Sequence, residues 1–256
     1  MKDHQVVAHP PDLALLAIAT DALDLVPEGS TIGLGTGRAA SVFIAALGAR
    51  VREGFKITGV PTSEASERQA RALGIEIDVL REGRPLEMII DGADEVAPSL
   101  DLIKGRGGAV VRERIVAAAS RRQVILVGSD KLVTALGERE PIPVEIIPMS
   151  MGLVLGRLKP LGLTPTLRRA SPGGPPTMTQ NGNLTLDCAL SAPLATRQEA
   201  RRIESAILEI PGVVDTGLFL GTAERVLVGY PDGKVQVLTA VSTHPADAPA
   251  TPGPGR

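Results

Sequence analysis

The stretch STIGLGTGRAASVFIAAL, residues 30–47, runs from a short β-prone segment through a glycine-rich turn into an amphipathic helix. We expect the strand at Ser30–Leu34 and the helix at Ala39–Leu47, with glycines at positions 33, 35 and 37 between them. The unit is repeated by a strand at Lys56–Val60 and a charged helix at Ser63–Leu73. Strands that alternate with helices of about ten residues predict an α/β fold with a parallel sheet covered on both faces.

The rest of the first half of the chain continues this alternation. Apolar residues recur at helical spacing from Asp12 to about Val26, and the pattern further predicts strands at 75–80, 86–90 and 123–127 and a helix at 109–119. The runs at 88–90 and 124–127 are continuously apolar, which is typical of central strands buried on both faces.

A second unit is predicted after Gly137, where prolines bracket the strand-like segment Pro141–Pro148. The expected order is strand, helix, strand, strand, helix, strand, at 144–147, 150–161, 166–169, 184–188, 196–209 and 213–214. This order is typical of a small α+β domain of the ferredoxin-like kind, and Asn181-Gly-Asn183 predicts a hairpin turn. Late strands at 218–220, 225–228 and 235–238 are expected to return to the first sheet. The predicted domains are 1–138 completed by 216–242, then 139–215, with a Pro-rich disordered tail at 243–256.

The composition excludes several classes of protein. The formal net charge of the 256 residues is −2, which gives no global attraction to nucleic acid or to an anionic membrane, so an anionic ligand needs a local cluster. Aromatic residues make up only 2%, which removes the stacking platforms of single-stranded nucleic-acid binders. No apolar run approaches the roughly 18 residues of a membrane span.

Cysteine and histidine usage argues against disulfides and zinc. The single cysteine, Cys188, excludes an intramolecular disulfide and fits the reducing cytoplasm, where we expect the protein to act. His4, His9 and His244 all lie near the ends of the chain, so a histidine-ligated zinc is not expected.

The loop Gly33-Leu-Gly-Thr-Gly37 lies between a predicted strand and a predicted helix, where backbone N–H groups can face an anion. Phosphate is the natural guest, although a tight turn without a ligand explains the glycines equally well. A dinucleotide is less favoured, because the spacing is G-x-G-x-G and the next strand ends in Gly59–Ser63 without a ribose-binding acid.

The acidic stretch MIIDGADEV, residues 88–96, places Asp91, Asp94 and Glu95 directly after a predicted central strand, and Lys104-Gly-Arg-Gly-Gly108 follows closely. A solvated turn capped by Asp91 is the simplest interpretation. Crowded carboxylates in a cleft can instead exchange protons near neutral pH, or they can bind Mg²⁺. The adjacent Lys104 favours metal-free proton transfer, and with the glycine loops this points to acid–base chemistry on a sugar phosphate.

Several strings then occur in an order that resembles type A ribose-5-phosphate isomerases, over about Leu13 to Val241. They are GLGTG, GVPTS, IDGADEV, LIKG-x-GGA with a following RE, SDKLV, PIPVEIIP, NGN and IPGVVDTGLF. The resemblance implies a Rossmann-like domain with an inserted α+β domain, and interconversion of ribose 5-phosphate and ribulose 5-phosphate without metal or organic cofactor. It also implies a homodimer or homotetramer.

The resemblance further implies roles for particular residues. Glu113 would be the base that moves a proton between C1 and C2, although the residues alone suggest an exposed helix position between two arginines. Asp91 would assist ring opening, Asp94 would bind hydroxyls, and Lys104 would stabilise the oxyanion with the Gly105–Gly107 backbone. The substrate-binding set would be Gly35, Thr36, Gly37, Arg38, Ala39, Gly92, Ala93, Gly105, Arg106, Gly107 and Lys131. Glu95 receives no chemistry and is expected simply to face solvent.

Departures from the family pattern gather around the phosphate. Arg38-Ala39 stands where Ser-Thr is usual, Arg106 replaces a glycine, and Leu13-Ala-Leu-Leu16 lacks a common lysine. We expect Arg38 or Arg106 to replace the missing donors, since a guanidinium can bind phosphate bidentately; the alternative is that both point to solvent. Gln180, in place of a common aspartate, is treated as structural.

Two other functions are weighed against the isomerase. The altered phosphate loop would suit a related sugar-phosphate isomerase with a shifted substrate. A non-catalytic sugar-phosphate sensor is disfavoured, because Asp91, Asp94, Lys104 and Glu113 are all present and no basic stripe or DNA-binding segment accompanies them.

Overall fold

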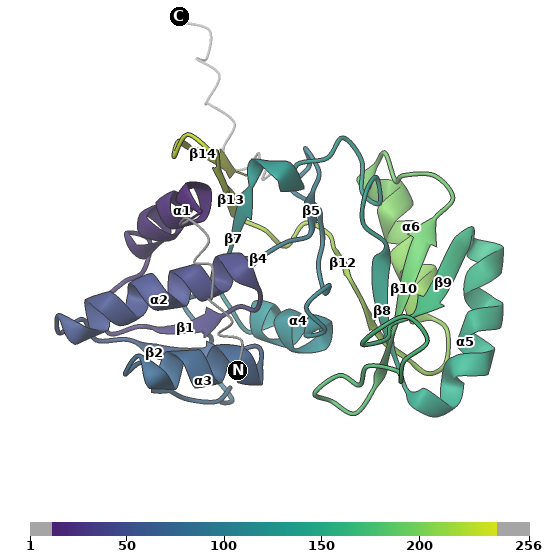
Figure 1. Ribbon diagram of the computed structural model, residues 1–256, viewed down its shortest axis with the longest axis horizontal. Coiled ribbons are helices and arrows are strands. Elements are labelled where there is room, and N and C mark those ends of the chain that lie inside the picture. The colour runs from purple at the N-terminus through teal and green to yellow at the C-terminus, as the bar shows by residue number, and fades with distance from the viewer. Residues whose placement is uncertain (1–11, 240–256) are drawn as a thin grey trace, which may run out of the picture.

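The computed structural model describes residues 12–239, which form a seven-stranded, a four-stranded and a three-stranded sheet with six α-helices (Figure 1). The helices are α1 (Leu13–Leu23), α2 (Arg38–Arg52), α3 (Glu64–Ala72), α4 (Val110–Ala118), α5 (Met151–Leu158) and α6 (Arg197–Leu208), with short 3₁₀ helices η1 (Ser129–Lys131), η2 (Pro148–Ser150) and η3 (Lys159–Leu161). The strands are β1 (Thr31–Leu34), β2 (Thr58–Pro61), β3 (Glu76–Ile77), β4 (Met88–Gly92), β5 (Glu95–Val96), β6 (Leu102–Ile103), β7 (Gln123–Gly128), β8 (Ile142–Ile146), β9 (Leu163–Leu167), β10 (Leu184–Leu190), β11 (Val213–Thr216), β12 (Leu218–Phe219), β13 (Arg225–Gly229) and β14 (Val235–Thr239). The predicted tail and the three histidines lie outside the described residues.

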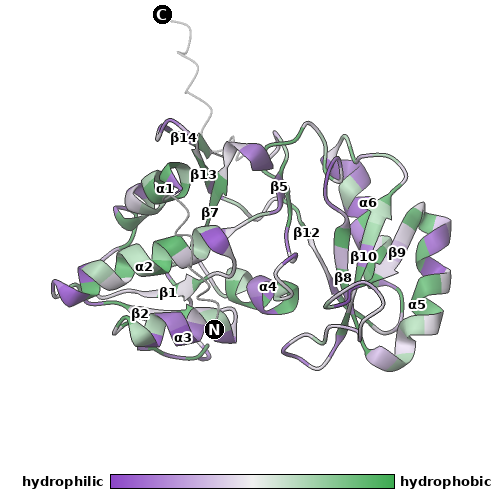
Figure 2. Cartoon of the chain, viewed as in Figure 1, coloured by the Kyte–Doolittle hydropathy of each residue, from purple (hydrophilic) through white to green (hydrophobic). Residues whose placement is uncertain are grey.

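The seven-stranded sheet has the order β14-β13-β7-β4-β1-β2-β3, and every neighbouring pair is parallel except β13 with β14. Met88 and Ile90 of β4 pack into the core shared with α1 and α2, whereas Ile89 contributes to the opposite face with Val116 of α4. Successive side chains of a strand point to opposite faces, so both faces need apolar residues. This explains the continuously apolar strands, and in Figure 2 the hydrophobic colour of β7 contrasts with the largely hydrophilic colour of α3, which lies at the other end of the sheet.

The four-stranded sheet has the order β11-β8-β10-β9 and is antiparallel throughout. Along the chain its elements follow the predicted order β8, α5, β9, β10, α6, β11, which is the ferredoxin-like arrangement. Val154 of α5 and Ile207 of α6 pack into one core with its strands. The chain enters this unit after β7 and returns to the seven-stranded sheet with β13; the division into domains at 138/139 and 215/216 stays a prediction.

The three-stranded sheet, with the order β12-β6-β5, corrects two expectations. Strand β12 does not return to the first sheet, because it pairs with β6; only β13 and β14 do. Glu95 of β5 does not face solvent but is buried, and its carboxylate accepts backbone hydrogen bonds from Gly137 (2.6 Å), Arg139 (2.6 Å) and Glu140 (2.8 Å). The two-residue strands β5 and β6 are too short to leave a periodic pattern.

Two predicted strands are displaced or shortened. Strand β9 covers Leu163–Leu167 and not 166–169, because it is an edge strand in which Pro165 is tolerated. The strand predicted at 75–80 is confined to β3. The predicted turn at Asn181–Asn183 does form before β10, with Thr179 N–H bonded to the Asn183 carbonyl at 2.8 Å. Within residues 12–239, no helix combines the length and apolarity needed to span a bilayer.

The buried Glu95 generates a prediction about stability. Glu95→Ala removes the acceptor of three backbone N–H groups, so we expect the free energy of unfolding to fall by about 2 to 4 kcal/mol. Urea denaturation of the variant beside the wild type measures the change. Glu82→Ala, at an exposed turn position, is the control, and equal losses in the two variants would contradict the assigned role.

Candidate active site

A cavity of about 990 Å³ opens at the carboxyl ends of β13, β7, β4 and β1, which are neighbours in the sheet. From β1 the chain proceeds to β2 on one side, while β4 and β7 lie on the other, and open α/β sheets bind ligands at such reversals. The predicted residues that line the cavity are Thr36, Gly37, Arg38, Ala39, Gly92, Ala93, Asp94, Lys104, Gly105, Arg106, Gly107, Glu113 and Lys131. Gly35 and Asp91 do not line it; they lie directly behind its wall.

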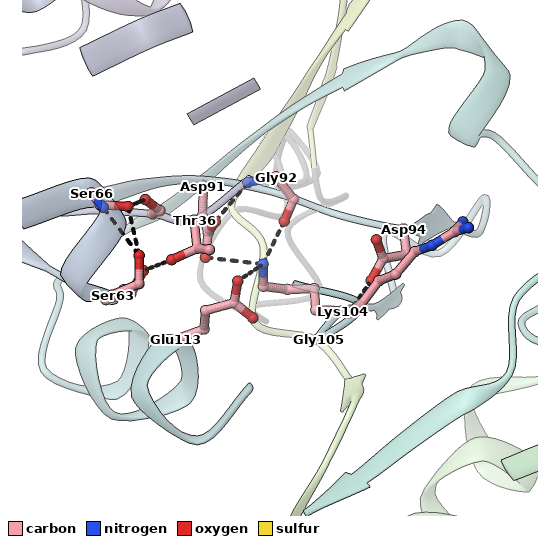
Figure 3. A network of polar contacts seen from close by, with 12 residues as sticks. Thr36, Ser63, Ser66, Asp91, Gly92, Asp94, Lys104, Gly105 and Glu113 are labelled. Atoms are coloured by element: carbon pink, nitrogen blue, oxygen red, sulfur yellow. Dashed lines mark hydrogen bonds and ion pairs between the residues drawn. The ribbon is translucent and has the colours of Figure 1, made fainter. Parts of the chain in front are cut away.

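Three buried charged side chains meet beside this cavity (Figure 3). Lys104 Nζ lies 2.9 Å from Asp91 Oδ2 and 3.5 Å from Glu113 Oε1. Asp91 is the penultimate residue of β4, Lys104 follows β6, and Glu113 lies in α4, so separate elements supply the three groups. We call Asp91, Lys104 and Glu113 the buried triad.

Asp91 is held by hydrogen bonds on one oxygen and by an ion pair on the other. Its Oδ1 accepts the N–H of Thr36 at 3.1 Å and of Gly92 at 2.8 Å, while Oδ2 pairs with Lys104. A side chain at Gly35 would place its Cβ 2.2 Å from Asp91 Oδ1, so the second glycine of the loop is required for this close approach. The glycine loop therefore positions the triad as well as lining the cavity.

Lys104 is held as a cation. Burial alone would lower the pKa of its ammonium, but the neighbouring Asp91 and Glu113 carboxylates outweigh that effect and raise the pKa. The ammonium also donates to the Gly92 carbonyl and lies 5.5 Å from the centre of the Phe219 ring.

Glu113 differs from Asp91 in having few partners. Burial raises the pKa of its carboxyl to about 8 against the opposing effect of Lys104, and Oε2 is buried without a hydrogen-bond partner among the described residues. The expectation of an exposed position was wrong. Val110, Glu113 and Val116 are spaced by three and form the buried stripe of α4, which is a signal that the flanking arginines obscured.

The arginines on either side of Glu113 attach α4 to the four-stranded unit. Arg112 donates to Asn181 Oδ1 at 3.1 Å and to the Gln180 carbonyl at 3.3 Å. Arg114 pairs with Asp215 at 2.7 Å and stacks 4.1 Å from the centre of the Phe219 ring. Gln180 also accepts the N–H of Glu64 at 3.1 Å, which agrees with its structural interpretation.

The two arginines expected at the phosphate are both paired with acids. The guanidinium of Arg38 lies 3.0 Å from Asp12 with its side chain 84% exposed, and that of Arg106 pairs with Glu140 and is 67% exposed. The backbone N–H of Arg106 is bonded to Asp94 Oδ2 at 3.0 Å. Both guanidinium groups thus lie at the solvent side of the cavity.

Sequence reasoning missed a supporting layer behind the glycine loop. The hydroxyl of Thr62 lies 2.7 Å from that of Thr36, and the hydroxyl of Ser66 donates to the Gly35 carbonyl at 2.6 Å. It also missed part of the lining, namely Asp12–Leu15, Leu126–Asp130, Gly229 and Pro231. The position of each of these segments at a strand end or helix start becomes visible only once the strand order is known.

The family model for ribose 5-phosphate isomerase A (phosphoriboisomerase A) matches residues 58–233. A ribose-5-phosphate isomerase A from Deinococcus radiodurans is 46% identical over 223 residues, covering 86% of this chain and 95% of that relative. The chain belongs to the ribose 5-phosphate isomerase A family. Like other members, it interconverts ribose 5-phosphate and ribulose 5-phosphate, as an isomerase of the pentose phosphate pathway.

Solved structures of ribose 5-phosphate isomerases agree with this membership. That of Methanocaldococcus jannaschii superposes with a TM-score of 0.82 at 38% identity, covering 89% of this chain and 98% of that one. A D-ribose-5-phosphate isomerase in complex with phospho-erythronic acid gives a TM-score of 0.82 at 33% identity, with 89% and 97% covered. The family resemblance and the α/β fold class expected from the sequence are confirmed.

The raised pKa of Glu113 makes stability depend on pH. The folded chain keeps this proton up to about pH 8, whereas the carboxyl of the unfolded chain releases it near 4.5. The folded state binds more protons across this window, so the contribution of Glu113 to the free energy of unfolding is largest below about pH 4.5 and is lost as pH rises to about 8. Glu113→Gln carries no such proton, and it should gain stability relative to the wild type between about pH 5 and 8 in urea denaturation.

Glu209→Gln, at an exposed end of α6, is the matched control and should show no such gain. If the difference in the free energy of unfolding between Glu113→Gln and the wild type is the same at about pH 5 and about pH 8, the raised pKa is refuted.

Proposed function

We propose that the chain performs this isomerisation without a metal ion, by proton transfer between C1 and C2 of the open sugar, with Glu113 as the base. The observation that carries the proposal is the carboxyl of Glu113, a cavity-lining residue buried beside Lys104, with one oxygen that has no hydrogen-bond partner among residues 12–239. A pKa near 8 leaves this group able both to take and to return a proton near neutral pH.

Lys104 would stabilise the enediolate oxygen that becomes negative as the proton leaves carbon. A fixed ammonium in a site shielded from water stabilises such charge strongly. The ammonium also occupies the space between Asp91 and Glu113 where a metal cation would otherwise bind, which favours metal-free chemistry. Asp91 would assist proton traffic and ring opening through Lys104, and the cavity-lining Asp94 would bind hydroxyls.

The phosphate would lie against the loop before α2. Thr36, Gly37, Arg38 and Ala39 line that end of the cavity, and α2 begins there without a side-chain cap on its free N–H groups. Lys131 lines the same cavity from the end of η1. By analogy with the relative solved with phospho-erythronic acid, we propose that this phosphorylated acid also binds here.

Metal-free turnover tests the assignment of Glu113. Purified protein with EDTA should convert ribose 5-phosphate to ribulose 5-phosphate, and Glu113→Gln should lower kcat by about a thousandfold or more, since the base itself is lost. Glu209→Gln should keep wild-type activity. In the wild type, kcat/KM should rise with pH through an apparent pKa well above 4.5, because the base must be ionised.

Other outcomes would favour the alternatives. Full activity in Glu113→Gln would refute the assigned base. A faster reaction on another sugar phosphate would indicate a shifted substrate. Tight binding of ribose 5-phosphate without turnover would indicate a sensor.

The arginines at the mouth of the cavity can be tested separately. If Arg38 or Arg106 turns from its acidic partner to the phosphate, Arg38→Ala or Arg106→Ala should raise KM for ribose 5-phosphate several-fold with kcat little changed, since binding is lost uniformly. Arg52→Ala, at the exposed far end of α2, is the control. An unchanged KM in both variants would show that neither arginine contacts phosphate.

We further propose that the enzyme acts in the cytoplasm as a homodimer or homotetramer. The lone Cys188 is free and buried, which fits a reducing compartment. Exposed apolar side chains at the start of α5 and just before it, Ile147, Met149 and Leu153, offer a surface that a second copy could cover.

A further inference from the structure

We propose that Arg168, held by Asp187, is a positioning residue that aims the backbone N–H of Gly107 at the reacting oxygen of the sugar. The inference rests on the proposed function, because it deepens the oxyanion role of the Gly105–Gly107 loop. Arg168 lies outside the cavity, at the end of β9 in the four-stranded unit, and acts on the site only through this loop.

The guanidinium of Arg168 binds the Gly105–Gly107 loop on the side away from the cavity. Its Nη1 donates to the Gly105 carbonyl at 2.9 Å and to the Arg106 carbonyl at 3.1 Å. The other edge of the guanidinium pairs with Asp187, with Nε 2.9 Å from Oδ2 and Nη2 bonded to Oδ1. One planar group therefore ties two consecutive carbonyls of the loop to a carboxylate of β10.

Because peptide groups are planar, the bonds from Arg168 to the two carbonyls also fix the direction of the N–H groups on the cavity side. In a trans peptide the C=O of one residue and the N–H of the next point in opposite directions. The N–H of Arg106 obeys this rule, because it points to Asp94, which lines the cavity, while the Gly105 carbonyl points to Arg168. By the same rule the N–H of Gly107 points away from Arg168, since the Arg106 carbonyl is bound to it.

The N–H of Gly107 is available to a ligand. No oxygen of residues 12–239 accepts a hydrogen bond from it, and Gly107 lines the cavity beside Thr36. Bonds from a cation to the carbonyls also polarise the peptides behind them, which strengthens the N–H groups as donors. A donor fixed in advance at an oxygen that becomes negative stabilises the transition state more than the bound sugar.

Arg168 is itself anchored to the sheet of the four-stranded unit. Arg168 extends the pairing of β9 with β10, because its N–H is bonded to the Thr185 carbonyl at 2.9 Å. Asp187 lies on β10, two residues from Thr185, so it is the diagonal cross-strand neighbour of Arg168. A long side chain such as that of arginine can bridge this separation. Without the guanidinium the loop would keep Gly105 at a φ of 104°, a conformation natural to glycine alone, but nothing would fix the following peptides.

The test separates positioning from folding by comparing kcat, KM and the affinity for 4-phosphoerythronate, an acid whose charged planar carboxylate resembles an enediolate. Arg168→Lys keeps the positive charge but loses the planar set of donors that binds the two carbonyls and Asp187 together. We expect kcat to fall about tenfold or more and the acid to bind correspondingly more weakly. KM for ribose 5-phosphate should stay within about twofold of the wild-type value. Asp187→Asn should show a smaller fall in the same direction. Millimolar guanidinium should partly restore kcat to Arg168→Ala, whereas urea at the same concentration should not.

The neighbouring Arg169→Lys is the matched control. The Arg169 side chain bonds the Gly174 carbonyl in an exposed turn, so this change should leave all three quantities unchanged. The proposal is overturned if Arg168→Lys and Asp187→Asn fold and keep wild-type kcat and wild-type affinity for the acid. It is also overturned if Arg169→Lys loses as much kcat and affinity as Arg168→Lys. Affinity for the acid is measured by calorimetry without turnover. The effect of Arg168 on the loop can therefore be measured even if Glu113→Gln stays active, which would show that the proposed base is wrong.

Discussion

Burial of the Lys104 ammonium between two carboxylates is the interaction on which the rest of the site depends. Removing an ammonium from water costs several kcal/mol unless charge and hydrogen bonds replace the lost hydration. Asp91 and the Gly92 carbonyl provide most of that replacement. Asp91 belongs to β4 of the large sheet, whereas Lys104 follows β6 and Glu113 lies in α4. The triad therefore forms only when the segment after β6 and helix α4 have packed against the large sheet.

The two carboxylates of the triad are unequal, and the proposed chemistry depends on this inequality. Asp91 accepts two backbone N–H groups on one oxygen and pairs closely with Lys104 on the other, whereas the only polar partner of the Glu113 carboxylate within residues 12–239 is the ammonium at 3.5 Å. Pairs of acids in unlike environments divide into a fixed charge and a proton carrier. Of the two carboxylates, only Glu113 is among the described residues that line the cavity, so the proposed proton carrier is also the one placed to reach a carbon of the sugar.

The alternation of strands and helices, the order of the smaller unit and the approximate positions of the acidic cluster and glycine loops could all be predicted, because each leaves a local pattern. Glu113 could not be found from the residues without the family resemblance, because its flanking arginines suggest an exposed face, and their partners Asn181 and Asp215 lie far along the chain. Glu95 was misplaced for the same reason, since its three donors come from residues 137–140. Local spacing carries no information about which distant backbone groups will meet a side chain.

None of the described residues that line the cavity comes from the four-stranded unit, yet this unit contacts the site at three points. Arg112 and Arg114 bind it on either side of Glu113, and Arg168 reaches from it to the loop after Lys104. Each contact is a cation on one unit bonded to carbonyls or a carboxylate on the other, and such bonds have a defined direction that apolar packing lacks. The proposed base and the proposed oxyanion loop are thus aligned from outside the large sheet. A displacement of the smaller unit would therefore disturb the proposed proton transfer before it disturbed the proposed phosphate site at α2, because within residues 12–239 none of these three arginines bonds to that site.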